Sequence, residues 1–101
     1  MRDRVRHSRA GDRREGASWA RGLRDQLRRA ALSVPLNVAE GAGRVSEADA
    51  ARHFAIARGS AMECAAVLDV IRALGAVPED RHRQGMELLA RVGAMLTKMC
   101  R

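Results

Sequence analysis

Residues 54–71 carry an apolar side chain at alternating steps of three and four positions. Because an α-helix turns once in about 3.6 residues, such steps place these side chains on one stripe of a helix. A half-buried strand needs apolar residues at every second position, and the sequence shows no such pattern. The chain is therefore predicted to be all-α. The residues of this heptad stripe are Phe54, Ala57, Ala61, Cys64, Leu68 and Ile71.

Three helices are predicted from such patterns and from their end signals. Ser18 and Ser46 are expected to cap the first two helices, and Gly41 and Gly75 to end them. Pro78 suits the first turn of the third. The second helix is apolar on two sides, so it must pack against more than one neighbour. We expect an up-and-down bundle with helices over about residues 18–41, 47–74 and 79–100.

A proline lies inside the first predicted helix. Pro35 removes one backbone hydrogen bond, which predicts a kink near Ala31 and Leu32. Ser33 and Asn37 flank this position and are placed to bond the freed carbonyls.

Residues 1–16 differ in composition from the rest of the chain. They contain six arginines, and Val5 is their only sizeable hydrophobe. Such a segment buries too little surface to offset its ordering entropy. We predict a basic tail, disordered or loosely helical, before one helical domain over residues 17–101; a specific RNA-binding arm is the alternative. No signal peptide or membrane-length apolar run is found, which predicts a cytoplasmic protein without a membrane partner.

The sequence lacks the motifs of catalytic, cofactor and metal sites. Cys64 and Cys100 stand apart from each other and from the three scattered histidines, so the tight ligand spacing of a zinc site is missing. Gly41-Ala-Gly43 is too short for a dinucleotide fingerprint, and no nucleophile–base pair accompanies Glu40 or Glu63. We therefore predict no metal, no cofactor and no enzymatic activity.

A basic excess predicts a nucleic-acid partner. The net charge is +7, from 19 basic and 12 acidic residues, and basic proteins favour contact with phosphate backbones. The near absence of aromatic residues argues against base-stacking platforms. Arg21, Arg24 and Arg28 share one helix face, which is either a phosphate-contacting strip or a solvated surface. The predicted nucleic-acid-binding residues are Arg21, Arg24, Arg28, Arg29 and Arg44.

Two sequence blocks resemble a known family. Residues 26–41 read Gln-Leu-Arg-Arg-Ala-Ala-Leu-Ser-Val-Pro-Leu-Asn-Val-Ala-Glu-Gly. This block is similar to the Ser-Ile-Pro-x-Asn-Ile-Ala-Glu-Gly signature of the four-helix-bundle proteins linked to intervening sequences of 23S ribosomal RNA, with valines for the isoleucines. Arg44 fits the family's Gly-x-x-Arg continuation, and residues 54–63 resemble its second block, which contains Ile-Ala-x-Gly-Ser-x-x-Glu. The resemblance covers roughly residues 20–100.

The resemblance implies a helical bundle that assembles into a ring, often a homopentamer. A related group, the accessory variability determinant of diversity-generating retroelements, binds nucleic acid and a reverse transcriptase. The family usually opens with an apolar helix that residues 1–16 do not supply, so we expect exposed apolar surface and a reliance on oligomerisation. The polar residues of the matching blocks form either a site or a buried hydrogen-bonded network: Asn37, Glu40, Arg44, Arg58, Ser60 and Glu63.

Three functional hypotheses follow. The first is a non-enzymatic, oligomeric scaffold that binds RNA through the arginines of the first helix and the tail. The second is a structural adaptor for a protein partner, such as a reverse-transcriptase accessory subunit, suggested by the small residues Ala57, Gly59, Ser60 and Ala61 on the second helix. The third is a truncated remnant without the family's first helix.

Overall fold

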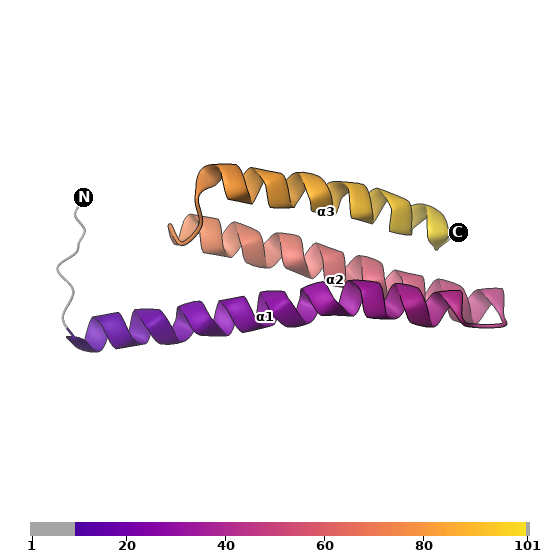
Figure 1. The fold of residues 1–101 in the computed structure, drawn as a ribbon, viewed down its shortest axis with the longest axis horizontal. Helices are drawn as coiled ribbons and strands as arrows, with labels where there is room; N and C mark the ends of the chain where they lie inside the picture. Colours follow the sequence, from indigo (N-terminus) through magenta and orange to yellow (C-terminus); the bar gives the residue numbers. More distant parts are fainter. Residues whose placement is uncertain (1–9, 101) are drawn as a thin grey trace.

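A computed structural model describes residues 10–100, and the side chains of residues 18–100. It contains helix α1 over Ala10–Ala42, α2 over Glu47–Ala73 and α3 over Glu79–Met99. The described part of the chain contains no strand. Successive helices run up and down beside each other (Figure 1). The predicted all-α, up-and-down fold is confirmed.

Helix α2 is the centre of the molecule. It packs against both α1 and α3, whereas α1 and α3 make no close backbone contact with each other. The described part measures 57 × 23 × 13 Å and has a radius of gyration of 17.2 Å. A compact chain of this length has a radius of gyration of about 13 Å. The fold is therefore open and elongated, and its long helices leave much surface exposed.

Helix α1 begins earlier than predicted. It starts at Ala10, so Ser18 lies within the helix and does not cap it. Residues 10–16 of the predicted tail are helical, and residues 1–9 lie outside the described residues. Once nucleated, a helix extends readily into neighbouring residues, because each added residue contributes one hydrogen bond. Figure 1 shows this first part of α1 extending past the turn that joins α2 and α3.

The helix also continues through Pro35 to Ala42. Asn37 Nδ2 donates hydrogen bonds to the Ser33 carbonyl oxygen at 2.9 Å and to Ser33 Oγ at 3.0 Å. These two residues thus bond to each other across the proline. The carbonyl that accepts is that of Ser33 and not that of Ala31, which Pro35 frees, so the predicted bonding of the freed carbonyl is not found among these contacts. The bonds keep this segment ordered where the proline removes a backbone donor.

The ends of α2 follow the sequence signals. Ser46 Oγ accepts a hydrogen bond from the Asp49 backbone nitrogen at 2.9 Å, which is the predicted N-cap. Gly75 has a φ of 72°, a left-handed conformation that glycine adopts without strain. The Ala76 nitrogen bonds the Ile71 carbonyl, and the Gly75 nitrogen bonds that of Arg72. This pair of bonds is a Schellman motif, and it ends the helix. Pro78 is the N-cap of α3, one position before its first turn.

The core is small and lies along α2. Two large members of the predicted stripe, Phe54 and Leu68, are only half-buried, while the smaller ones are buried. No helix in the described part is long and apolar enough to cross a membrane. The buried apolar residues are Ala30, Ala57, Ala61, Cys64, Val67, Ile71 and Leu96. Exposed large apolar residues include Leu32, Leu36, Ile56, Met62, Val70, Leu74, Leu88 and Met95.

Candidate nucleic-acid interface

Four of the predicted basic residues lie close together along α1 and are exposed. Helix α1 faces α2 through side chains such as Gln26, whose Nε2 donates to Glu63 Oε2 at 3.2 Å. Arg28 lies two positions from Gln26, which is about 200° of rotation around the helix, and Arg21 lies on the same side as Arg28. These two side chains therefore point away from α2. Arg24 instead borders Ile71 and Ala76 at the edge of the helix pair, and Arg29, three positions from Gln26, lies on the side of Gln26. We call Arg21, Arg24, Arg28 and Arg29 the α1 basic strip; all four are exposed.

Most of this strip is not neutralised by the side chains that the structure describes. Arg28 Nη1 pairs with Asp25 Oδ1 at 2.8 Å, and both side chains are more than half exposed. Arg21, Arg24 and Arg29 form no ion pair with any residue that the structure describes. Exposed ion pairs contribute only about 0–1 kcal/mol, so Arg28 can exchange its carboxylate for another anion at little cost.

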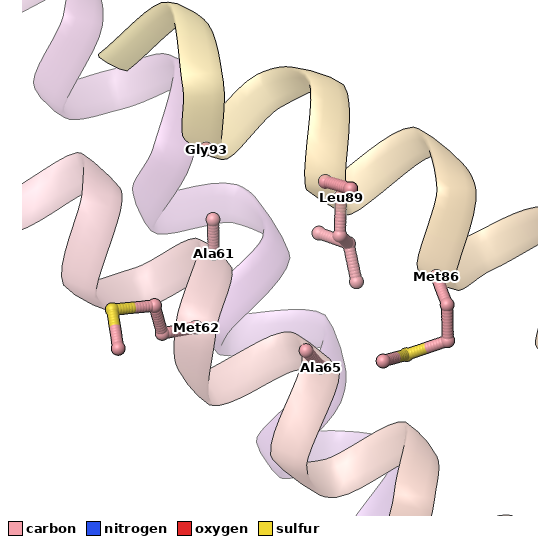
Figure 2. A pocket seen from close by; sticks show the side chains of 7 residues that line it. Ala61, Met62, Ala65, Met86, Leu89 and Gly93 are labelled. Atoms are coloured by element: carbon pink, nitrogen blue, oxygen red, sulfur yellow. The ribbon is translucent and has the colours of Figure 1, made fainter. Parts of the chain in front are cut away.

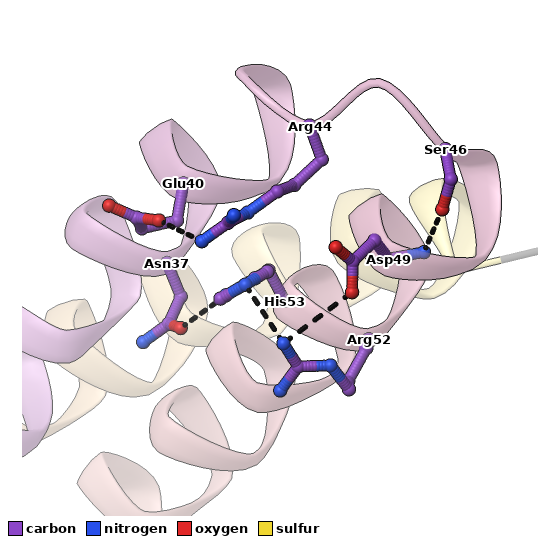
Figure 3. Close-up of polar contacts among 7 residues, drawn as sticks. All are labelled: Asn37, Glu40, Arg44, Ser46, Asp49, Arg52 and His53. Atoms are coloured by element: carbon purple, nitrogen blue, oxygen red, sulfur yellow. Dashed lines mark hydrogen bonds and ion pairs between the residues drawn. The ribbon is translucent and has the colours of Figure 1, made fainter.

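Arg44 does not join the strip. It lies just past the opposite end of α1, about 35 Å from Arg21 by the helix rise of 1.5 Å per residue. Its Nη2 pairs with Glu40 Oε1 at 2.6 Å, so two of the predicted polar residues bond each other (Figure 3). Arg44 is thus a separate basic point at the α1–α2 turn.

A chain of hydrogen bonds crosses the α1–α2 interface near the proline. Ser60 Oγ donates to Ser33 Oγ at 2.7 Å, and Asn37 Nδ2 donates to the same oxygen. Asn37 Oδ1 lies 3.2 Å from His53 Nδ1. Of the predicted network, Asn37 and Ser60 take part, while Glu40 and Glu63 bond elsewhere. Arg58 makes no hydrogen bond or ion pair with the described residues.

His53 was not anticipated as a member of this chain. Arg52 Nη2 lies 3.3 Å from His53 Nε2, and a guanidinium can only donate, so Nε2 is the acceptor. In the tautomer that fits this contact, Nδ1–H donates to Asn37 Oδ1. Arg52 is also paired with Asp49 Oδ1 at 3.5 Å (Figure 3). Because every member of the chain has a partner, the arrangement fixes the helix pair and offers no free acid or base. Helix spacing could have placed His53 on the buried side of α2, since it lies four positions before the buried Ala57.

The α2–α3 interface is built differently. The buried His82 bonds Asp69 Oδ1 through Nε2 at 2.8 Å, and Arg72 Nη1 bonds Glu79 Oε2 at 3.3 Å. Both contacts lie near the turn that joins the two helices. Farther along, an apolar cavity of about 260 Å³ opens between α2 and α3 (Figure 2).

The environment of Cys64 does not activate its thiol. Cys64 is buried in the core, and burial, together with the Glu63 carboxylate, raises the pKa of its thiol. A thiol with a raised pKa stays protonated near neutral pH and is a poor nucleophile or metal ligand. Among the described residues, no three His, Cys, Asp or Glu side chains gather as a metal ion would need.

The comparison with protein families agrees with the sequence blocks and the helical fold. Residues 17–98 match the family described as 23S rRNA-intervening sequence protein. The chain belongs to this family. The matched region contains the α1 basic strip, the α1–α2 hydrogen-bond chain and nearly all of α3. No curated protein and no solved structure matches the chain.

Proposed function

We propose that this family member is a non-enzymatic scaffold that binds RNA through the α1 basic strip. The observation that supports the proposal most directly is the exposure of all four arginines of the α1 basic strip, on a helix that α2 holds in place. Because the helix is already folded, it keeps these guanidinium groups close together, and contact with a phosphate backbone needs little reordering of the protein backbone. The net charge of +7 adds a favourable field.

Binding of this kind is electrostatic and largely independent of sequence. Each phosphate that an arginine neutralises releases condensed counterions, so affinity falls steeply with salt. Four contacts on a duplex give a slope of about −3.6 in log K against log salt, from a value of about −0.9 per phosphate. Arg44 provides a second contact point for an RNA that follows α1 along its length.

Self-association belongs to the same proposal. The small core and the exposed apolar residues support an oligomer, and the family resemblance suggests a ring of five. Several copies of the α1 basic strip on one particle raise the effective concentration of binding sites, and overall affinity rises with no new type of contact.

A filter-binding titration with a structured RNA at low salt tests the proposal. The variant Arg21→Ala/Arg24→Ala/Arg29→Ala removes the three arginines of the strip that pair with no side chain among residues 18–100. Its matched control, Arg81→Ala/Arg91→Ala/Lys98→Ala, removes three exposed cations from α3. If the strip contacts phosphates, the RNA affinity of the first variant should fall at least about tenfold, and that of the control should fall less than about threefold.

Two results contradict the proposal. One is the absence of RNA binding by the unmodified protein at low salt. The other is an equal loss of affinity in both triple variants, which would assign binding to net charge alone. Non-cooperative thermal melting of the unmodified protein would favour the remaining alternative, a truncated remnant.

The adaptor hypothesis now depends on a different surface. The small residues that suggested it include Ala57, Ser60 and Ala61, and these are buried within the fold of this chain, while Gly59 is exposed. The open space between α2 and α3 is the feature that favours a protein partner.

A further inference from the structure

An apolar groove runs along the junction of α2 and α3. Helix α2 contributes Ala61, Met62 and Ala65, and α3 contributes Met86, Leu89, Ala90 and Gly93. Figure 2 shows the side chains of Leu89 and Met86 beside the space that separates the two helices. Met62 is 65 % exposed, so the groove opens to solvent at the α2 side. A lining without a single charged side chain is unusual for an exposed surface and indicates a binding face.

The dimensions of the groove suit a helix. Its α3 wall runs from Met86 to Gly93, which is two helical turns or about 10 Å. An amphipathic helix inserts anchors at spacings of three, four and seven residues over this length. The small side chains of Ala61, Ala65 and Ala90 let a neighbouring backbone approach closely, and methionine adapts to irregular shapes.

Cations flank the groove on both helices. Arg58 lies three and seven positions before Ala61 and Ala65, so it continues the α2 wall. Arg83 bears the same relation to Met86 and Ala90 on α3. Neither arginine forms an ion pair with any described residue. Glu87 also lies on this side of α3, but Arg83 and Arg91 flank it four positions away on either side.

We propose that this groove binds an amphipathic helix of a partner protein, with acidic residues flanking its apolar stripe. A second copy of the chain is the less favourable occupant, because its two outer helices, α1 and α3, are net basic and would bring cations against Arg58 and Arg83. Residues 17–44, for example, carry five arginines and only two carboxylates. An acidic helix instead buries its apolar stripe on the methionines and places carboxylates beside the two arginines. This interaction is independent of RNA binding by α1.

Fluorescence anisotropy with two labelled synthetic peptides tests this assignment. Both peptides span about four helical turns and carry leucine at i, i+4, i+7 and i+11; one has glutamate at the flanking positions and the other lysine. We expect the full-length protein to bind the glutamate peptide at least about tenfold more tightly than the lysine peptide.

A charge exchange makes the test specific to the groove. Arg58→Glu/Arg83→Glu is expected to weaken binding of the glutamate peptide at least about tenfold and to strengthen binding of the lysine peptide. The control Arg21→Glu/Arg24→Glu makes the same change in net charge on the α1 basic strip and should leave both affinities within about twofold. Circular dichroism establishes that both variants are folded.

Three outcomes overturn the proposal. The first is failure of the glutamate peptide to bind, and the second is equal binding of both peptides. The third is a groove that is already filled by a second copy of the chain. In that case the Met62→Gln variant has a lower sedimentation coefficient than the unmodified protein, and the glutamate peptide does not displace the second copy.

Discussion

The two interfaces of α2 differ in how they are specified. Toward α1, hydrogen bonds link Ser60, Ser33, Asn37 and His53 in one chain, and Phe54 packs directly on Gly41. Toward α3, the polar contacts lie near one end and the remainder is apolar, with open space. Directional bonds fix the first helix pair in one arrangement. Small residues and methionines allow the second pair to adjust, so we expect α3 to be the more easily displaced helix.

The largest effect should come from removing the main buried side chain of α3. Leu96 is 2 % exposed, and α3 otherwise buries only His82. Leu96→Ala is expected to lower the free energy of unfolding by about 2–5 kcal/mol, measured by urea denaturation, because a cavity replaces its contacts. The exposed Met95→Ala is the control, with a change below about 0.5 kcal/mol. Equal losses in the two variants would show that α3 is not held by this residue.

A smaller loss is expected from cutting the hydrogen-bond chain in its middle. Asn37→Leu leaves the His53 N–H without its acceptor and removes the bonds to Ser33, which should cost about 1–3 kcal/mol. Glu40→Gln, three residues away, breaks an exposed ion pair and should cost about 0.5 kcal/mol or less. If Asn37→Leu were as mild as Glu40→Gln, the polar chain would not specify the α1–α2 interface.

The smallest effect is expected where the groove has room. Ala90→Leu adds side-chain volume to an open cavity, so stability should change by less than about 1 kcal/mol. Gly41→Ala is the matched test at the tight interface, because its Cβ would lie 2.5 Å from Phe54 Cε1. Forced overpacking there should cost about 1–3 kcal/mol. A loss for Ala90→Leu as large as that for Gly41→Ala would contradict the difference in packing.

The sequence predicted correctly the features that depend on the spacing of residues within one helix. The heptad stripe of residues 54–71 located α2, and Ser46 and Gly75 marked its ends correctly. The start of α1 was missed because residues 10–17 extend the helix without an apolar face, and periodicity detects only faces that are buried. The propagation of a helix into such residues produces no apolar periodicity that the sequence could show.

The site was less accessible to sequence reasoning, for a related reason. The orientation of Arg21 and Arg28 followed from helix spacing once α1 was recognised. Asn37 and His53 are 16 residues apart and lie on different helices, so the sequence alone does not show that they bond each other. The groove between Met62 and Met86 depends on the distance between two helices. The spacing of residues within one helix shows only toward which side of that helix a side chain points.

Native-state hydrogen exchange measures the central difference most directly, because it reports the opening free energy of each helix in the unmodified protein. The structure predicts that amides of α3 exchange through openings of lower free energy than amides of α1 and α2 around Asn37 and Ser60. Equal protection across all three helices, or stronger protection in α3, would contradict the account.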